Sequence, residues 1–363
     1  MPLPVRTDFP LRSLEESSPL PSCWIEPLSG WHLPLLDDPA FLPLHPLLQR
    51  TLLLSVPRKL ASSLARRQSM GSLVLVALAR ERRGRARILG LIIARPHNRR
   101  GSCWEVQHLR LALAAGDAPL SPGRIATASG LLREAIQAGR GAASWIATAS
   151  SLDEDRLATL REQGFQPQRT ERIWRWQPQA KPPVPALAAN LLLRPLQQRN
   201  ASLLWHLERA TCPAPLRQVL DRRIEDLLDR SAGHGWLLID AERNEAVAGA
   251  RWLADHPAGG HQVELSVHPG WSHLLGAPTE LLLRRLMPAA GQLWLASDLD
   301  DPARQSWLNQ LGAEEHGDRV LMARSLWRRQ EGQTSLGAAS RLSAVLEQLQ
   351  PRRRSVPTPL RHR

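Results

Sequence analysis

One stretch of the sequence has residue types and spacing that could bind a phosphate group. It begins at Val263 and reads VELSVHPGWSHLLGAPTE, which is an apolar strand pattern, then a loop with Gly and Pro, then the start of a helical pattern. Backbone N–H groups at a helix start point at any anion placed there, and the helix dipole favours its negative charge. The stretch therefore predicts a phosphate site between a strand and a helix.

Other groups of reactive residues predict no metal site. Cys23, Cys103 and Cys212 are far apart and lack the pair spacing of zinc or redox sites, so buried single thiols are expected. The acidic residues at 298–301 are better explained as a helix start, with Asp301 as the N-cap and proline at the first helical position.

The composition is that of a soluble chain with more than one hydrophobic core. Its 363 residues suggest two or three domains, and 43% of them are hydrophobic. No apolar run has the length of a membrane span, and the first residues lack the pattern of a secretory signal, so we expect a cytoplasmic protein that contacts no membrane. The chain has 13 Trp and no Tyr, so no tyrosine hydroxyl can take part in its chemistry.

The net charge of +13 is concentrated at one end. Residues 328–363 hold eight Arg and two Glu and so carry +6 of it. This composition predicts a disordered basic tail that could bind an acidic protein or a nucleic acid, with a solubilising extension as the alternative. Arginine fills nearly every cationic position, which coding bias would also produce.

The expected elements occur in two similar series. The first has strands at 72–80, 86–96 and 103–114, a helix at 125–138, a strand at 144–150, a helix ending at Gly164 and a closing strand RIWRW. The second has a strand at 190–196, helices at 201–210 and 216–230, strands at 235–241, 246–254 and 261–268, a helix at 279–287, a strand at 292–297, a helix ending at Gly312 and a closing strand. The Pro-rich segment 177–188 is typical of a linker between them.

Matching positions in the two series keep a slowly drifting separation. Gly90 and Gly249 in the hairpins are 159 residues apart, and Gly164 and Gly312 are 148 apart. Divergent repeats with insertions produce such a drift. Seven of the extra residues fall in the first series between the third strand and the following helix, in the loop where a phosphate would bind.

This order of elements, closing in L-x-x-x-G, resembles the GCN5-related N-acetyltransferase (GNAT) family, and Val267, Pro269 and Trp271 match the start of its cofactor motif. The resemblance implies an α+β fold with two GNAT-like domains, each a mixed, mostly antiparallel sheet flanked by helices. We expect an N-terminal degenerate domain at 1–176, a linker at 177–188, a C-terminal domain at 189–327 and the tail at 328–363.

The family binds acetyl-CoA, and the resemblance assigns the second copy's residues to it. The edge of the third strand, at Leu265, Ser266 and Val267, would pair with the pantetheine arm, while His273, Gly276 and Ala277 would lie at the diphosphate. A solvent-facing loop residue is the alternative for His273. In the first copy Ala126 and Ala128 stand where glycines are expected, with Arg124 as a candidate phosphate cation.

The resemblance also suggests the catalytic residues. A carboxylate on the third strand often acts as general base, which points to Glu264, with Glu105 in the first copy; a solvated strand residue is the alternative. The family's usual general acid is a tyrosine, and Leu308 and Leu160 stand at its position in the two copies. The implied function is an acetyl-CoA-dependent N-acyltransferase on an unidentified amine, with the C-terminal domain active. The alternative is a non-catalytic relative that binds a protein or nucleic acid.

Overall fold

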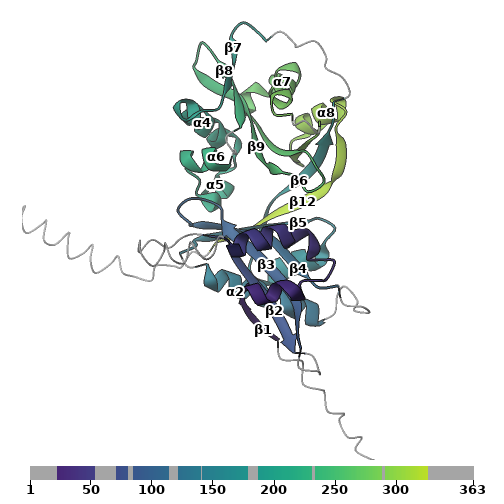
Figure 1. Cartoon of the computed structure of the whole chain (residues 1–363). Coiled ribbons are helices and arrows are strands. Elements are labelled where there is room, and N and C mark those ends of the chain that lie inside the picture. Colours follow the sequence, from purple (N-terminus) through teal and green to yellow (C-terminus); the bar gives the residue numbers. More distant parts are fainter. Residues whose placement is uncertain are drawn as a thin grey trace, which may run out of the picture. The chain divides into compact units, whose positions relative to one another are not determined.

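The computed structural model of the chain describes residues 23–53, 71–80, 85–113, 122–139, 141–178, 187–230, 234–287 and 291–325. The strands in these residues form one 12-stranded sheet with helices packed against it (Figure 1). The α+β class predicted from the sequence is confirmed. The predicted basic tail at 328–363 and most of the linker, residues 179–186, lie outside the described residues.

The first copy follows the predicted order of strands and helices. Its elements are β1 (Cys23–Pro27), η1 (Gly30–Leu35), η2 (Leu42–Leu44), β2 (Leu73–Arg80), β3 (Ala86–Pro96), β4 (Cys103–Leu111), α2 (Pro122–Ala138), β5 (Ser144–Ser150), α3 (Glu154–Glu162) and β6 (Gln166–Trp176). The bounds of β3 and β5 coincide with the prediction because both are continuous apolar runs. The predicted elements did not include β1, which pairs antiparallel with β2 at the edge of the sheet.

The second copy repeats this order. Its elements are β7 (Leu191–Pro195), η3 (Gln198–Asn200), α4 (Ala201–Thr211), α5 (Ala214–Leu220), α6 (Ile224–Arg230), β8 (Gly235–Asp240), β9 (Glu245–Asp255), β10 (His261–Val267), η4 (Pro269–Leu274), α7 (Ala277–Arg285), β11 (Leu293–Asp298), α8 (Pro302–Gln310) and β12 (Glu314–Ser325). Helix α4 packs on β9 and β10, and α7 packs on β8 and β9.

The closing strands of the two copies are exchanged. The strand order is β1-β2-β3-β4-β5-β12-β6-β11-β10-β9-β8-β7, so β12 lies beside β5 of the first copy and β6 lies beside β11 of the second. Both of these pairings are antiparallel, and β6 and β12 also pair with each other. The sequence predicts two closing strands, whereas the structure shows that each completes the sheet of the other copy.

Large aromatic residues fix the exchange in place. Trp174 and Trp176 of β6 are fully buried in the hydrophobic core of the second copy, with Leu238, Leu282 and Leu293 among their neighbours. The Trp174 indole N–H also donates to Ser297 Oγ at 2.8 Å. Burial of an aromatic side chain contributes more than that of most other residues, so these two anchor the first copy's last strand in the second copy.

The last helix of each copy begins and ends in the same way. Asp153 accepts from the backbone N–H of Arg156, and Asp301 accepts from that of Arg304, as the N-cap prediction for Asp301 requires. Gly164 and Gly312 then take positive φ values of 81° and 77° after each helix. These shared caps support the interpretation of the chain as two copies of one repeated module.

The predicted helix 216–230 is two helices rather than one. It breaks at Asp221, which has a left-handed φ of 43° between α5 and α6. The first copy holds this break, because Ser102 Oγ donates to the Asp221 carboxylate at 2.5 Å and Asn98 Nδ2 donates to the Leu220 carbonyl at 3.1 Å. No local pattern predicts a break that a distant turn imposes.

Candidate active site

The third and fourth strands of the second copy, β10 and β11, pair only over a short stretch. Parallel pairing of β10 with β11 covers only His261 and Gln262, after which no β11 partner faces β10. The other edge of β10 stays paired with β9 as far as Val267. In the first copy β4 and β5 remain paired through four residues, to Val106. Each copy therefore leaves the last five residues of its third strand without a partner on this side, 263–267 in the second copy and 107–111 in the first.

The loop that follows β10 leads directly into a helix N-terminus. Residues 269–274 form η4, Gly276 is the N-cap of α7, and Pro278 lies in its first turn. The Thr279 hydroxyl lies 3.0 Å from the Gly276 nitrogen and 2.9 Å from the Leu274 carbonyl oxygen, which fixes the turn. A Cβ atom added at Gly276 would meet no atom within 4 Å, so the N-terminus of α7 has open space beside it.

The structure places the predicted cofactor residues along this path. Leu265 and Val267 are buried in the core of the second copy, which leaves their backbone at the strand edge. His273 is exposed and lies beside Trp271, with ring centroids 5.3 Å apart. Gly276 and Ala277 form the start of α7. Ser266 differs, because its hydroxyl donates to Glu208 Oε1 at 3.1 Å and points toward α4.

The candidate base Glu264 is ion-paired. Arg251 of β9 donates to its Oε2, and Arg222 lies 3.8 Å from its Oε1. The side chain is 27% exposed, whereas that of Arg251 is 1% exposed. A solvated strand residue, the alternative for Glu264, does not describe this environment.

Glu208 of α4 completes a buried cluster of four charges, with Glu264, Arg222 and Arg251. Arg251 donates to Glu208 Oε1 at 3.1 Å and to the Leu227 carbonyl at 3.0 Å, while Arg222 donates to Glu208 Oε2 at 3.3 Å. Two carboxylates and two guanidiniums leave the cluster without formal net charge. Such neutralisation is what makes buried charges tolerable.

The cluster extends into the first copy through His97. The Nε of Arg222 donates to His97 Nε2 at 3.2 Å, and because a guanidinium only donates, that nitrogen must be the acceptor. His97 therefore carries its proton on Nδ1, which lies 3.6 Å from Glu105 Oε2. The two predicted carboxylates, Glu105 and Glu264, are thus joined by a histidine and an arginine.

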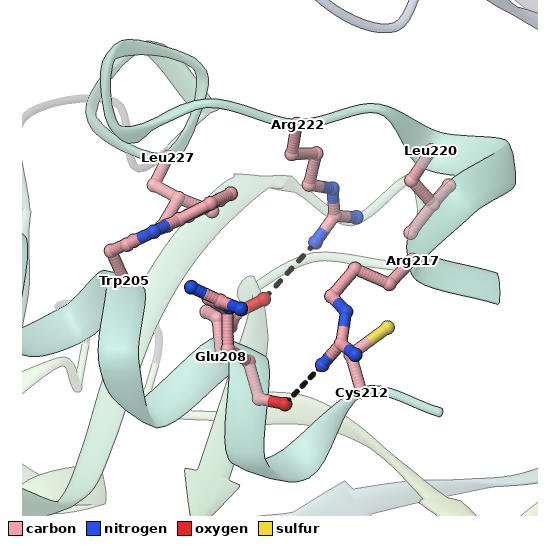
Figure 2. Close-up of a pocket in the computed structure, with 8 residues that line it drawn as sticks. Trp205, Glu208, Cys212, Arg217, Leu220, Arg222 and Leu227 are labelled. Carbon is pink, nitrogen blue, oxygen red and sulfur yellow. Dashed lines mark hydrogen bonds and ion pairs between the residues drawn. The ribbon is translucent and has the colours of Figure 1, made fainter. Parts of the chain in front are cut away.

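A small pocket of about 20 Å³, room for about one water molecule, lies next to the cluster (Figure 2). Trp205 and Leu227 form one side of it and Leu220 and Arg217 another, while Arg222 points across it to Glu208. Cys212 also lines the pocket, and burial raises the pKa of its thiol.

Three residues of the cluster, Glu208, Arg222 and Arg251, were not predicted from the sequence, although the sequence holds a signal for two of them. Glu208 follows Leu204 by four residues and so falls on the apolar face of α4, and Arg251 interrupts the apolar run of β9. A charge on a face that must be buried indicates a partner elsewhere. The identity of the partner requires the tertiary structure.

The first copy has a different arrangement at the equivalent loop. Ala126 and Ala128 lie inside α2 rather than in a loop, and Arg124 donates to the Ala112 carbonyl. Glu105 pairs with Arg95, and Gln107 two residues further on also faces that arginine. Residues 114–121, in the loop that carries the extra residues, lie outside the described residues.

The tyrosine positions of the family are part of the hydrophobic core. Leu160 and Leu308 are each 1% exposed. Neither can supply a proton. Within the described residues, no group of three or more His, Cys, Asp or Glu side chains is arranged to hold a metal ion, and no helix has the length and apolar character that crossing a bilayer requires.

Comparison with known proteins identifies the fold. No model of a protein family matches the chain, and no curated protein matches it in sequence. A GCN5-related N-acetyltransferase from Sphaerobacter thermophilus superposes with a TM-score of 0.50 at 12% identity, covering 84% of this chain and 95% of that one. A tandem GNAT protein from the clavulanic acid biosynthesis pathway gives 0.50 at 15%, covering 84% and 98%. The chain therefore has the GNAT fold, and the match with the tandem GNAT protein extends over nearly the whole length of that protein.

Proposed function

We propose that the protein is an N-acyltransferase that uses acetyl-CoA and an amine acceptor, with its active site in the C-terminal copy. One observation carries the proposal: the unpaired edge of β10 leads through a short loop to the N-terminus of α7. A strand edge offers hydrogen bonds to an extended amide chain, and a helix N-terminus favours a diphosphate.

The residues along this path fit the donor. The backbone of Leu265, Ser266 and Val267 would hold the pantetheine arm, and His273, Gly276 and Ala277 would lie at the diphosphate. Bound there, acetyl-CoA would supply an activated thioester. Pro278 has no N–H to offer, so the first turn of α7 gives fewer donors than a glycine-rich loop would.

Glu264 is the proposed acceptor of the amine proton. Its Oε2 already accepts a hydrogen bond from Arg251 and its Oε1 lies 3.8 Å from Arg222, so both oxygens face a guanidinium. We therefore expect this site to accelerate transfer mainly by orienting the amine, and to leave protonation of the thiolate to water because Leu308 has no proton to give. Slow turnover is the consequence.

The N-terminal copy is proposed to shape the acceptor side rather than to catalyse. Its turn at 97–102 holds the break at Asp221, and His97 orients Arg222 at the wall of the pocket. An amine entering the pocket between α4 and α6 would reach Glu264 beside Arg222. The domain limits expected from the sequence, and a cytoplasmic location, belong to this proposal.

The proposal is tested by calorimetric titration of acetyl-CoA into the intact protein and a Gly276→Glu variant. A Cβ atom added at Gly276 would meet no atom within 4 Å, so folding should persist, while the carboxylate of the glutamate repels a diphosphate. Micromolar binding that the variant loses would support the site, and an acceptor screen that follows thiol release would then test turnover. A folded intact protein that binds no acetyl-CoA would refute the proposal.

A second candidate function is non-catalytic binding of a protein or nucleic acid. It is favoured by the ion pairs of Glu264 and by the leucines at both tyrosine positions. The Arg-rich tail would provide the contact with an acidic partner. Binding of acetyl-CoA without turnover over a broad panel of amines would favour this candidate.

A further inference from the structure

The side chain of Arg304 reaches the backbone of β10. Arg304 is in the first turn of α8, where its backbone N–H donates to the N-cap Asp301 at 3.0 Å. Its side chain is 16% exposed, and its Nε lies 3.2 Å from Asp301 Oδ2. Burial lowers the pKa of this guanidinium from its ordinary value, yet arginine remains charged in proteins.

The guanidinium is hydrogen-bonded to the part of β10 that has no β11 partner. Arg304 Nη1 donates to the Leu265 carbonyl oxygen at 2.9 Å. Leu265 lies three residues beyond Gln262, where pairing with β11 stops, so no β11 residue faces this part of β10. The arginine thus takes a position that a strand neighbour would otherwise occupy.

An extended amide chain bound along β10 needs the same position. Such a chain pairs with a strand edge by donating its N–H groups to the strand's carbonyls. The Leu265 carbonyl lies in the middle of the edge assigned to the pantetheine arm. A guanidinium in contact with this oxygen occupies the space through which the arm would pass.

The same residue type recurs at the same place in the first copy. Arg156 has the position in α3 that Arg304 has in α8, 148 residues later, and its N–H donates to the N-cap Asp153 at 3.1 Å. Its Nε is buried without a hydrogen-bond partner among the described residues. A cap and an arginine that both recur at one helix start indicate an element of the module rather than a chance contact.

We propose that Arg304 competes with the pantetheine arm for the edge of β10 and so sets the affinity of the second copy for acyl-CoA. This inference rests on the proposed function. A hydrogen bond from a charged donor to a carbonyl changes a binding constant by about ten- to a hundredfold. Removal of the side chain should therefore tighten binding by about that factor.

The test is calorimetric titration of acetyl-CoA into the intact protein and an Arg304→Ala variant. Arg156→Ala is the matched control, since it removes the same side chain from the same helix position in the other copy and should leave the dissociation constant within about twofold. Both alanine variants keep the backbone N–H that donates to the N-cap carboxylate. The double variant Arg304→Ala, Gly276→Glu should lose the tighter binding of acetyl-CoA. That loss would show that the tighter binding uses the site at the α7 loop.

Folding of the variants is checked by circular dichroism and thermal unfolding. Should Arg304→Ala not fold, Arg304→Met fills the space of the stem without donating a hydrogen bond, and tighter binding is again expected. A folded variant that binds acetyl-CoA as the intact protein does, or more weakly, overturns the inference and leaves the proposed function standing. Weaker binding would make the arginine a ligand of the cofactor.

Two further outcomes separate the inference from the proposed function. Binding by Arg304→Ala but not by the intact protein would support the inference and refute acyl-CoA use by the native chain. Absence of binding by both folded proteins would refute the inference and the proposed function together.

Discussion

Replacement of Arg251 by methionine should destabilise the protein strongly. The guanidinium of Arg251 is 1% exposed, and its loss removes the donor to Glu208 and Leu227 and the ion pair with Glu264. Two carboxylates would then share Arg222, which lies 3.3 Å from one and 3.8 Å from the other. Breaking a buried ion pair by removing one partner costs about 3–5 kcal/mol. Because Glu264 keeps partial contact with solvent, we expect the lower end, about 3 kcal/mol.

Urea unfolding followed by tryptophan fluorescence measures this free energy directly, since the chain has 13 Trp. Arg175→Met is the matched control, because Arg175 pairs with Glu314 on the surface, where both side chains are at least 36% exposed. Exposed pairs contribute about 0–1 kcal/mol, so the control should lie close to the unmodified protein. If Arg251→Met loses no more than Arg175→Met, the cluster does not stabilise the fold and our reading of it is wrong.

Two more predictions concern pH and backbone geometry. Burial, aided by neighbouring arginines, lowers the pKa of His108 from its ordinary value of 6.5. As the pH falls through 6.5, the unfolded chain therefore binds more protons than the folded one, and the free energy of unfolding decreases. His108→Asn should flatten the decline in urea midpoint between pH 7 and 5, and an unchanged slope would contradict the assignment. Gly260→Ala should cost more than about 2 kcal/mol, as its Cβ would lie 2.3 Å from the Gln292 carbonyl oxygen. The control Gly317→Ala shares the positive φ but meets open space, so its cost should stay near 1 kcal/mol, and equal costs by urea unfolding would refute the clash.

Local patterns predicted most elements of this fold. Alternating or continuous apolar runs gave β3 and β5 with their observed bounds, and the cap at Asp301 followed from one acidic residue before a proline. These features depend on near neighbours in the chain, so sequence alone specifies them. The break at Asp221 and the exchange of β6 and β12 depend on partners more than a hundred residues away, which periodicity does not report.

The same division holds at the candidate site. Glu264 and Gly276 could be placed on a strand and at a helix start because their motif is contiguous. The arginines that neutralise Glu264 come from other elements, and no spacing links them to it. The sequence does hold a signal for Arg304, because an aspartate three residues before an arginine starts the last helix of both copies.

The exchanged closing strands have a consequence for the order of synthesis. The chain must reach residue 325 before β5, near position 150, gains the neighbour that covers its edge. Until then a growing first half presents an open strand edge, a template for pairing with other chains. Because contacts between distant parts of a chain form slowly, we expect the sheet of the first copy to be completed late in folding. A substitution near position 320 would therefore disturb β5 of the first copy, which pairs with that part of β12.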